Sequence, residues 1–83
     1  MPAPDHQVIL VTRASCHLCE EAEQVLRRMR AELRFDYREV DVDSAPALQA
    51  EFSDRVPVIL LDGREHGYWR VEEARLRRAL ERS

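Results

Sequence analysis

Hydrophobic and polar positions follow two different spacings in the first part of the chain. Residues 7–12 form a largely apolar run, which is typical of a central β-strand covered on both faces. Over about residues 16–33 apolar side chains recur every three or four positions, so this segment is predicted to be an amphipathic helix. Its apolar positions are Leu18, Ala22, Val25, Leu26, Met29 and Leu33. On its polar face Glu23 precedes Arg27 by one turn, the favourable order for an ion pair.

A second strand and a short helix are predicted next. Residues 35–42 carry apolar side chains at both odd and even positions, which indicates a strand buried on both faces or a small bulge. Asp43 and Ser44 are good N-cap residues and Pro46 is tolerated in a first helical turn, so we expect a short helix that ends at about Phe52. Its expected core contacts are Leu48 and Phe52.

The remaining residues predict a hairpin and a final helix. Residues 56–61 are expected to form a third strand, and residues 64–69 a fourth. Asp62-Gly63 between them is a strong signal for a type I′ turn, because this turn requires positive φ at both central residues. Residues 72–81 are predicted to be helical, with Leu76, Ala79 and Leu80 available for packing.

The predicted element order is β-α-β-α-β-β-α. The first two strands and the helix between them make a right-handed parallel unit, and the hairpin adds two antiparallel strands. We therefore expect an α/β sandwich with a mixed four-stranded sheet and helices on both faces. The 83 residues allow only one modest core, so residues 1–83 are expected to form a single domain.

Charge and composition narrow the functions that this domain can have. The chain has 16 acidic and 13 basic residues and a formal charge of −3, which argues against nucleic acid as its main partner. Its longest aliphatic runs are far shorter than a membrane span or the core of a secretory signal requires. We expect a cytoplasmic monomer that does not bind membranes.

The two cysteines are the residues that indicate a chemistry. Cys16 and Cys19 form a C-x-x-C motif directly after the first strand and at the start of the predicted helix. A cysteine in the first helical turn faces unpaired backbone N–H groups and the positive end of the helix dipole, which favour the thiolate. Cys19 lies one turn further on the same side. We therefore expect Cys16 to attack a substrate disulfide and Cys19 to resolve the mixed disulfide, without a cofactor.

Other interpretations of this pair remain open. A structural zinc ion would need two more ligands, and the sequence has no second C-x-x-C or H-x-x-x-H, so no metal site is expected. The cysteines are inert if the domain only binds partner peptides. A third alternative is a dimer that holds an iron–sulfur cluster through Cys16 and glutathione.

The run from Val11 to Cys19, followed later by Val56-Pro57 at the start of an apolar strand, resembles the glutaredoxin branch of the thioredoxin fold. It is similar in particular to short bacterial glutaredoxin-like proteins. The resemblance covers nearly the whole chain. It implies that Pro57 follows a cis peptide bond beside the cysteine pair and that the backbone of Val56 pairs with the substrate. The alternative is an ordinary trans proline at a sheet edge.

The resemblance also implies how substrates are bound. Arg13 matches the basic residue with which glutaredoxins hold a carboxylate of glutathione, although an exposed loop arginine is an equal alternative. A protonated His17 would stabilise the Cys16 thiolate, unless it is merely a solvent-exposed residue. Glutathione is thus a candidate co-substrate, and disulfide-containing proteins and a reductase are the other implied partners. The sequence departs from most glutaredoxins at His17-Leu18, at Arg55 and at residues 68–70.

Overall fold

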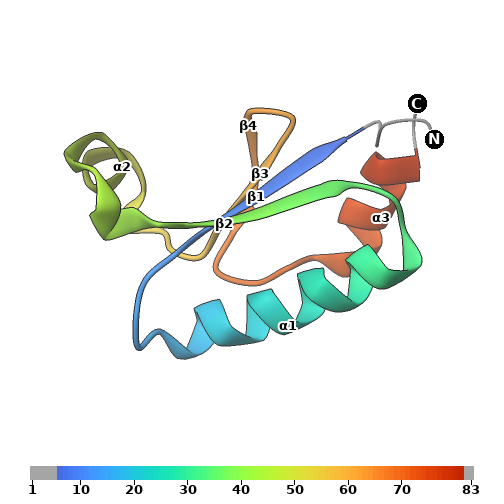
Figure 1. Ribbon diagram of the computed structural model, residues 1–83, viewed down its shortest axis with the longest axis horizontal. Coiled ribbons are helices and arrows are strands. Elements are labelled where there is room, and N and C mark those ends of the chain that lie inside the picture. Colours follow the sequence, from blue (N-terminus) through green and yellow to red (C-terminus); the bar gives the residue numbers. More distant parts are fainter. Residues whose placement is uncertain (1–5, 82–83) are drawn as a thin grey trace.

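The computed structural model describes residues 6–81, which form a four-stranded mixed sheet flanked by helices (Figure 1). In chain order the elements are β1 (Gln7–Thr12), α1 (His17–Glu32), β2 (Asp36–Asp41), the 3₁₀ helix η1 (Val42–Ser44), α2 (Pro46–Phe52), β3 (Val58–Leu61), β4 (Arg64–Tyr68) and α3 (Glu73–Glu81). The strands lie in the order β2-β1-β3-β4. Strand β1 pairs parallel with β2 and antiparallel with β3, and β3 pairs antiparallel with β4. The predicted fold class is confirmed.

Two apolar clusters, one on each face of the sheet, make up the core. The first lies between the sheet and helices α1 and α3, and its buried members are Val8, Leu10, Ala22, Leu26, Met29, Phe35, Ile59 and Leu76. The second lies beneath α2 and consists of Val11, Val42, Phe52 and Val58. Strand β1 supplies residues to both clusters, which explains why residues 7–12 lack a polar face.

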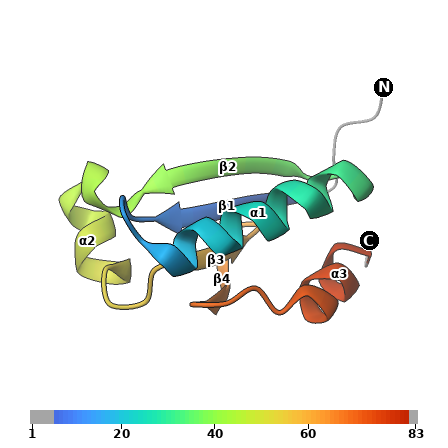
Figure 2. The same cartoon turned by 90° about the horizontal axis from the view of Figure 1, so that it is seen from below.

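Helices α1 and α3 lie on the same side of the sheet (Figures 1 and 2). Besides the apolar contacts, two arginines join their exposed surfaces. Arg28 of α1 donates two hydrogen bonds to the Glu73 carboxylate of α3, at 2.9 and 3.0 Å. Arg77 of α3 donates to Glu32 of α1 at 2.9 Å. None of the helices in residues 6–81 is long and apolar enough to cross a membrane.

The β3–β4 hairpin has the turn that its sequence predicts. Asp62 and Gly63 have φ values of 53° and 85°, as a type I′ turn requires. The Asp62 carboxylate also accepts hydrogen bonds from the backbone N–H of Gln7, at 2.8 Å, and from Nδ1 of His6, at 2.7 Å. These two bonds lower the pKa of Asp62 and tie the hairpin to the beginning of β1.

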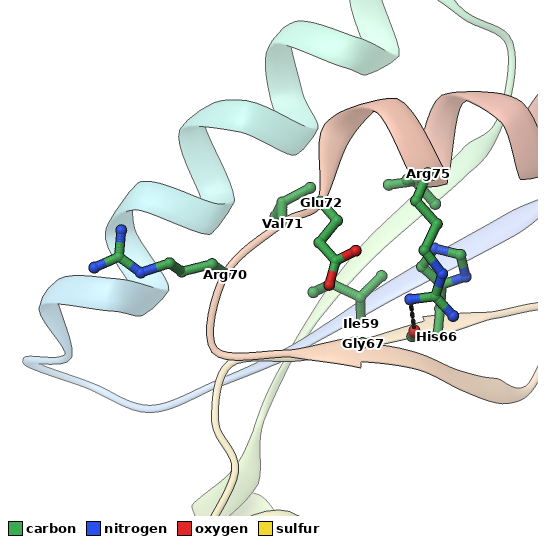
Figure 3. Close-up of a pocket in the computed structure, with 8 residues that line it drawn as sticks. Ile59, His66, Gly67, Arg70, Val71, Glu72 and Arg75 are labelled. Atoms are coloured by element: carbon green, nitrogen blue, oxygen red, sulfur yellow. Dashed lines mark hydrogen bonds between the residues drawn. The ribbon is translucent and has the colours of Figure 1, made fainter.

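The junction between β4 and α3 contains a partly buried histidine (Figure 3). Arg75 of α3 donates from Nη1 to the backbone oxygen of His66, at 2.7 Å. The Nε2 atom of His66 is buried and has no hydrogen-bond partner among residues 6–81. Burial, together with the positive charge of Arg75, lowers the pKa of His66, so its imidazole is neutral at pH 7.

Strand β3 begins at Val58, two residues later than expected. Three further details differ from the sequence predictions. The N-cap of α2 is Ala45 and not Asp43 or Ser44, because Asp41 caps the intervening helix η1 by accepting from the N–H of Asp43 at 2.9 Å. Strand β4 ends one residue earlier than expected, because Trp69 has a φ of 68° and leaves the extended conformation. The third difference concerns the ion pair of Arg27.

Arg27 pairs across to the sheet and not with Glu23 on its own helix. Its Nε and Nη2 atoms donate to the two carboxylate oxygens of Glu39 on β2, at 3.0 and 2.9 Å. Tyr37 donates its hydroxyl hydrogen to the same carboxylate at 2.7 Å. Burial by itself would raise the pKa of Glu39, but these hydrogen bonds lower it. Two parallel hydrogen bonds from the planar guanidinium to one carboxylate are stronger than the single contact that Arg27 would make with Glu23 on its own helix.

Candidate functional site

Cys16 is the N-cap residue of α1, one position before the helix starts. Its backbone is extended, with φ −107° and ψ 115°, and its Sγ accepts a hydrogen bond from the backbone N–H of Cys19 at 3.3 Å. The sulfur thus takes the place that a serine or aspartate oxygen has in most N-caps. The unpaired N–H groups at the start of α1 and the positive end of the helix dipole therefore face this sulfur.

Cys19 differs from Cys16 in its exposure. Both are free thiols, but Cys16 is half-buried whereas Cys19 is only 2% exposed. Burial, reinforced by the interaction with Cys16, raises the pKa of Cys19 to about 11. Cys19 is therefore protonated at neutral pH and shielded from solvent, while the Cys16 sulfur is accessible. This asymmetry agrees with the roles that the sequence analysis assigned to the two thiols.

An open pocket of about 260 Å³ lies beside the two cysteines. The loop between β1 and α1 forms one wall, and Asp41 at the end of β2 contributes to another. The charged residues that line it are Arg13, Glu20, Glu23 and Asp41. Among residues 6–81, no group of three or more His, Cys, Asp or Glu side chains is arranged to hold a metal ion.

Arg13 and His17, both predicted to bind substrate, lie near the cysteines. The Arg13 side chain is 40% exposed, and its Nε lies 3.7 Å from a carboxylate oxygen of Asp43. His17 is 84% exposed in the first turn of α1, and its Nε2 lies 3.9 Å from the Glu21 carboxylate. Both side chains are thus accessible from solvent, and each has a carboxylate within 4 Å.

Val56 and Pro57 lie at the same end of the sheet as the cysteine loop. The residue after Pro57, Val58, is paired with Val11, and β1 leads into the loop one residue after Val11. The Val56–Pro57 peptide bond is cis, as the resemblance implies, and Pro57 is buried. The Pro57 carbonyl accepts the backbone N–H of Trp69 at 2.7 Å, so the end of β4 is tied to this corner.

Trp69 is a residue of this region that the sequence analysis did not assign to the site. Tyr68 and Trp69 are the exposed large hydrophobic residues among residues 6–81, at 47% and 52%, and their rings pack edge to face. Trp69 and Arg70 line an open groove of about 240 Å³ together with Leu18, the residue before Cys19. Figure 3 shows the Arg70 side chain extending toward the first turns of α1. Two adjacent aromatic residues at the end of the predicted fourth strand were the available sequence signal.

Asp41 was also missed, for a different reason. In the sequence it lies far from the cysteines, and only the parallel register, which pairs Asp41 with Thr12, brings it to the pocket. Asp43 reaches Arg13 because η1 follows β2 directly. No local signal in the sequence reports such contacts between strands.

Comparisons with known proteins agree with this architecture. The chain matches the Glutaredoxin-like domain (DUF836) over residues 7–81. It is 51% identical over 82 residues to "Uncharacterized protein Rv0508" of Mycobacterium tuberculosis and to "Uncharacterized protein Mb0520" of Mycobacterium bovis. Each match covers 93% of this chain and 84% of the relative.

Solved structures show the same fold. Protein XcR50 from X. campestris is 35% identical with a TM-score of 0.71, over 92% of this chain and 97% of that one. Protein Ne2328 from Nitrosomonas europaea has a TM-score of 0.82 at 24% identity, over 98% and 96%. A mutant thioredoxin from Halobacterium salinarum has a TM-score of 0.71 at 24% identity, over 93% and 73%. The chain therefore belongs to the glutaredoxin-like domain family and has the thioredoxin fold.

Proposed function

We propose that this protein is a thiol-disulfide oxidoreductase in which Cys16 is the attacking thiol and Cys19 the resolving thiol. The proposal rests on one observation above all: the accessible Cys16 sulfur caps α1 and accepts the N–H of the buried Cys19 at 3.3 Å. This geometry stabilises a thiolate where a substrate can reach it and keeps the second thiol directly behind it.

In the first step the Cys16 thiolate attacks one sulfur of a substrate disulfide. A mixed disulfide forms between Cys16 and that sulfur, and the other substrate sulfur leaves as a thiolate, which takes a proton from water. Cys16 now carries no charge. Burial still raises the pKa of Cys19, but the repulsion from a Cys16 thiolate, which also raises it, is then removed.

In the second step Cys19 gives up its proton to water and its thiolate attacks the Cys16 sulfur. The bond between Cys16 and the substrate breaks, and the second substrate sulfur leaves as a thiolate, which takes a proton from water to become a thiol. The protein is left with a Cys16–Cys19 disulfide, so two electrons have passed to the substrate. Because both electrons come from sulfur, the reaction needs no cofactor.

The other parts of the proposal follow from this chemistry. The substrates are disulfide-containing proteins or glutathione disulfide, and a reductase or glutathione returns the oxidised pair to its thiols. The protein works as a monomer in the cytoplasm, where the reducing environment keeps such pairs available. The residues proposed to bind the substrate are Arg13 and His17, in the loop and first turn around Cys16, and Val56 and Pro57, just before β3.

The test uses pre-reduced protein and hydroxyethyl disulfide, an uncharged substrate. The native chain should release two molecules of mercaptoethanol and become oxidised. Cys19→Ser should release one and keep the other as an adduct on Cys16, because the resolving thiol is gone. Cys16→Ser should release none on the same timescale. Intact-mass spectrometry and a thiol assay measure both quantities.

Two results would contradict the proposal. An adduct that forms as fast on Cys16→Ser as on Cys19→Ser would reverse the roles of the two thiols. A native chain no more reactive than a free cysteine would instead favour a domain that binds partners through the same surface with its cysteines inert.

A further inference from the structure

The pocket beside the cysteines carries more negative than positive charge. Glu20 and Glu23 lie on the first turns of α1, and Asp41 ends β2. None of these three carboxylates forms an ion pair within 4 Å among residues 6–81. Glu23 also faces Arg27, whose pKa it helps to raise, so the negative charge of the pocket rests mainly on Glu20 and Asp41. The helix N-terminus contributes a positive field at the Cys16 sulfur, but this field fades within the first turn.

The positive charge of Arg13, in the pocket wall, is balanced by a nearby carboxylate. Arg13 lies with its Nε 3.7 Å from the Asp43 carboxylate, which leaves this pair without net charge. A substrate that brings a sulfur to Cys16 therefore places its neighbouring groups close to three carboxylates and to an arginine that already has a partner. The carboxylates and Cys16 line the same pocket, so a charge bound there is screened less than charges that lie further apart than the Debye length of about 8 Å in physiological salt.

We propose that the site prefers disulfides flanked by positive charge to anionic ones, so that glutathione disulfide, one of the two substrates named above, is the poorer of them. This inference rests on the proposed exchange reaction and names its substrate class. The recognised chemistry is a cationic group within a few bonds of the disulfide, on a polypeptide or on a small amine. The electrons move as above: the dithiol is oxidised to the Cys16–Cys19 disulfide, and the cationic disulfide is reduced to two thiols.

The test compares three small disulfides that differ in charge. Cystamine carries two ammonium groups, hydroxyethyl disulfide is uncharged, and dithiodipropionate carries two carboxylates. Their leaving thiols differ in acidity, so each rate constant with the reduced protein is divided by the rate constant with dithiothreitol, an uncharged dithiol. At low ionic strength the corrected rate for cystamine should exceed that for dithiodipropionate by on the order of tenfold, and molar salt should reduce the ratio toward one.

Substitutions that remove either a negative or a positive charge from the pocket make the test specific. Glu20→Gln and Asp41→Asn should each reduce the cystamine-to-dithiodipropionate ratio, whereas Arg13→Gln should increase it. Glu81→Gln is the matched control. It removes the same charge from α3, at the end of the molecule away from the start of α1 (Figures 1 and 2). The control should leave the ratio within about twofold of its native value, since two charges far apart in salt are screened from each other.

A second pair of substrates tests whether the cationic group belongs to a polypeptide or to a small amine. Disulfide-linked peptides with lysine or with glutamate beside the cysteine are compared in the same way, and the lysine peptide should react faster. A corrected rate above that of cystamine assigns the site to polypeptides, and one below it assigns the site to small amines. Trp69→Ala should lower the rate only for peptides, because the groove lined by Trp69 and Leu18 begins where a longer substrate would lie.

The failure of this inference differs from the failure of the proposed function. If hydroxyethyl disulfide is not reduced, the exchange reaction itself is refuted. If it is reduced but the anionic disulfide reacts as fast as cystamine after correction, the charge selection is wrong and the oxidoreductase remains. Equal effects of Glu20→Gln and Glu81→Gln would likewise overturn the inference, because the selection would then come from the net charge of the chain.

Discussion

Iodoacetamide at pH 7 should modify Cys16 at least a hundredfold faster than Cys19. The perturbation is a brief, limited treatment of the reduced native chain with this reagent, which reacts with thiolates and hardly with thiols. Cys16 is accessible and its sulfur faces the N-terminus of α1, whereas Cys19 is 2% exposed. The reagent therefore distinguishes the two thiols by ionisation and by access at once.

The magnitude follows from the raised pKa of the buried thiol. With a pKa of about 11, roughly one Cys19 in ten thousand is a thiolate at pH 7. A free cysteine with a pKa near 8.5 is about 3% thiolate at this pH. Ionisation alone therefore slows Cys19 about three-hundredfold relative to a free cysteine. Burial of the sulfur slows it further.

Tandem mass spectrometry reads the result at each position. Trypsin cleaves after Arg13 and Arg27, so both cysteines lie on the peptide of residues 14–27, and fragment ions between them show which one is alkylated. In Cys16→Ser the labelling of Cys19 should rise about tenfold for each pH unit from pH 7 to 9. The reasoning is refuted if Cys19 is labelled first, or if both positions react at the rate of a free cysteine.

The remaining predictions concern stability, measured by urea unfolding. Leu26→Ala should cost about 2–5 kcal/mol, because Leu26 is fully buried between α1 and the sheet. Gly63→Ala should lower the free energy of unfolding by about 1 kcal/mol. This loss comes from the φ of 85° alone, since nothing lies within 4 Å of the added Cβ. Gly67 has no positive φ, so Gly67→Ala should lower the free energy of unfolding by less. Burial lowers the pKa of His66, so as the pH falls below 6.5 this histidine is protonated in the unfolded chain before it is in the folded one. The free energy of unfolding should therefore fall below pH 6.5, and it should fall less in His66→Phe. Because the pKa of Cys19 is raised, the unfolded chain loses its thiol proton first; stability should fall between about pH 9 and 11, and less so in Cys19→Ala. Burial also raises the pKa of Tyr37, so some loss above about pH 10 should remain in this variant.

The predictions from sequence succeeded where the information is local. Apolar spacing, together with capping and turn residues, predicted the strands and α-helices that the structure describes, with ends displaced by up to two residues, because these signals belong to the element itself. The turn at Asp62-Gly63 was predictable for the same reason, since positive φ is a property of the residues that adopt it. The roles of Arg13, His17, Val56 and Pro57 toward a substrate stay predictions.

What the sequence by itself determined is the order of the elements and the position of the C-x-x-C motif at the start of a helix. Only the tertiary structure decided which charges surround that motif. Asp41 reaches the pocket through the parallel register of β1 and β2, Asp43 pairs with Arg13, and Arg27 binds Glu39 instead of Glu23. The difference in exposure between Cys16 and Cys19 also depends on the layers packed around α1. These properties arise from contacts between residues distant in sequence, which register and packing create and which no local pattern encodes.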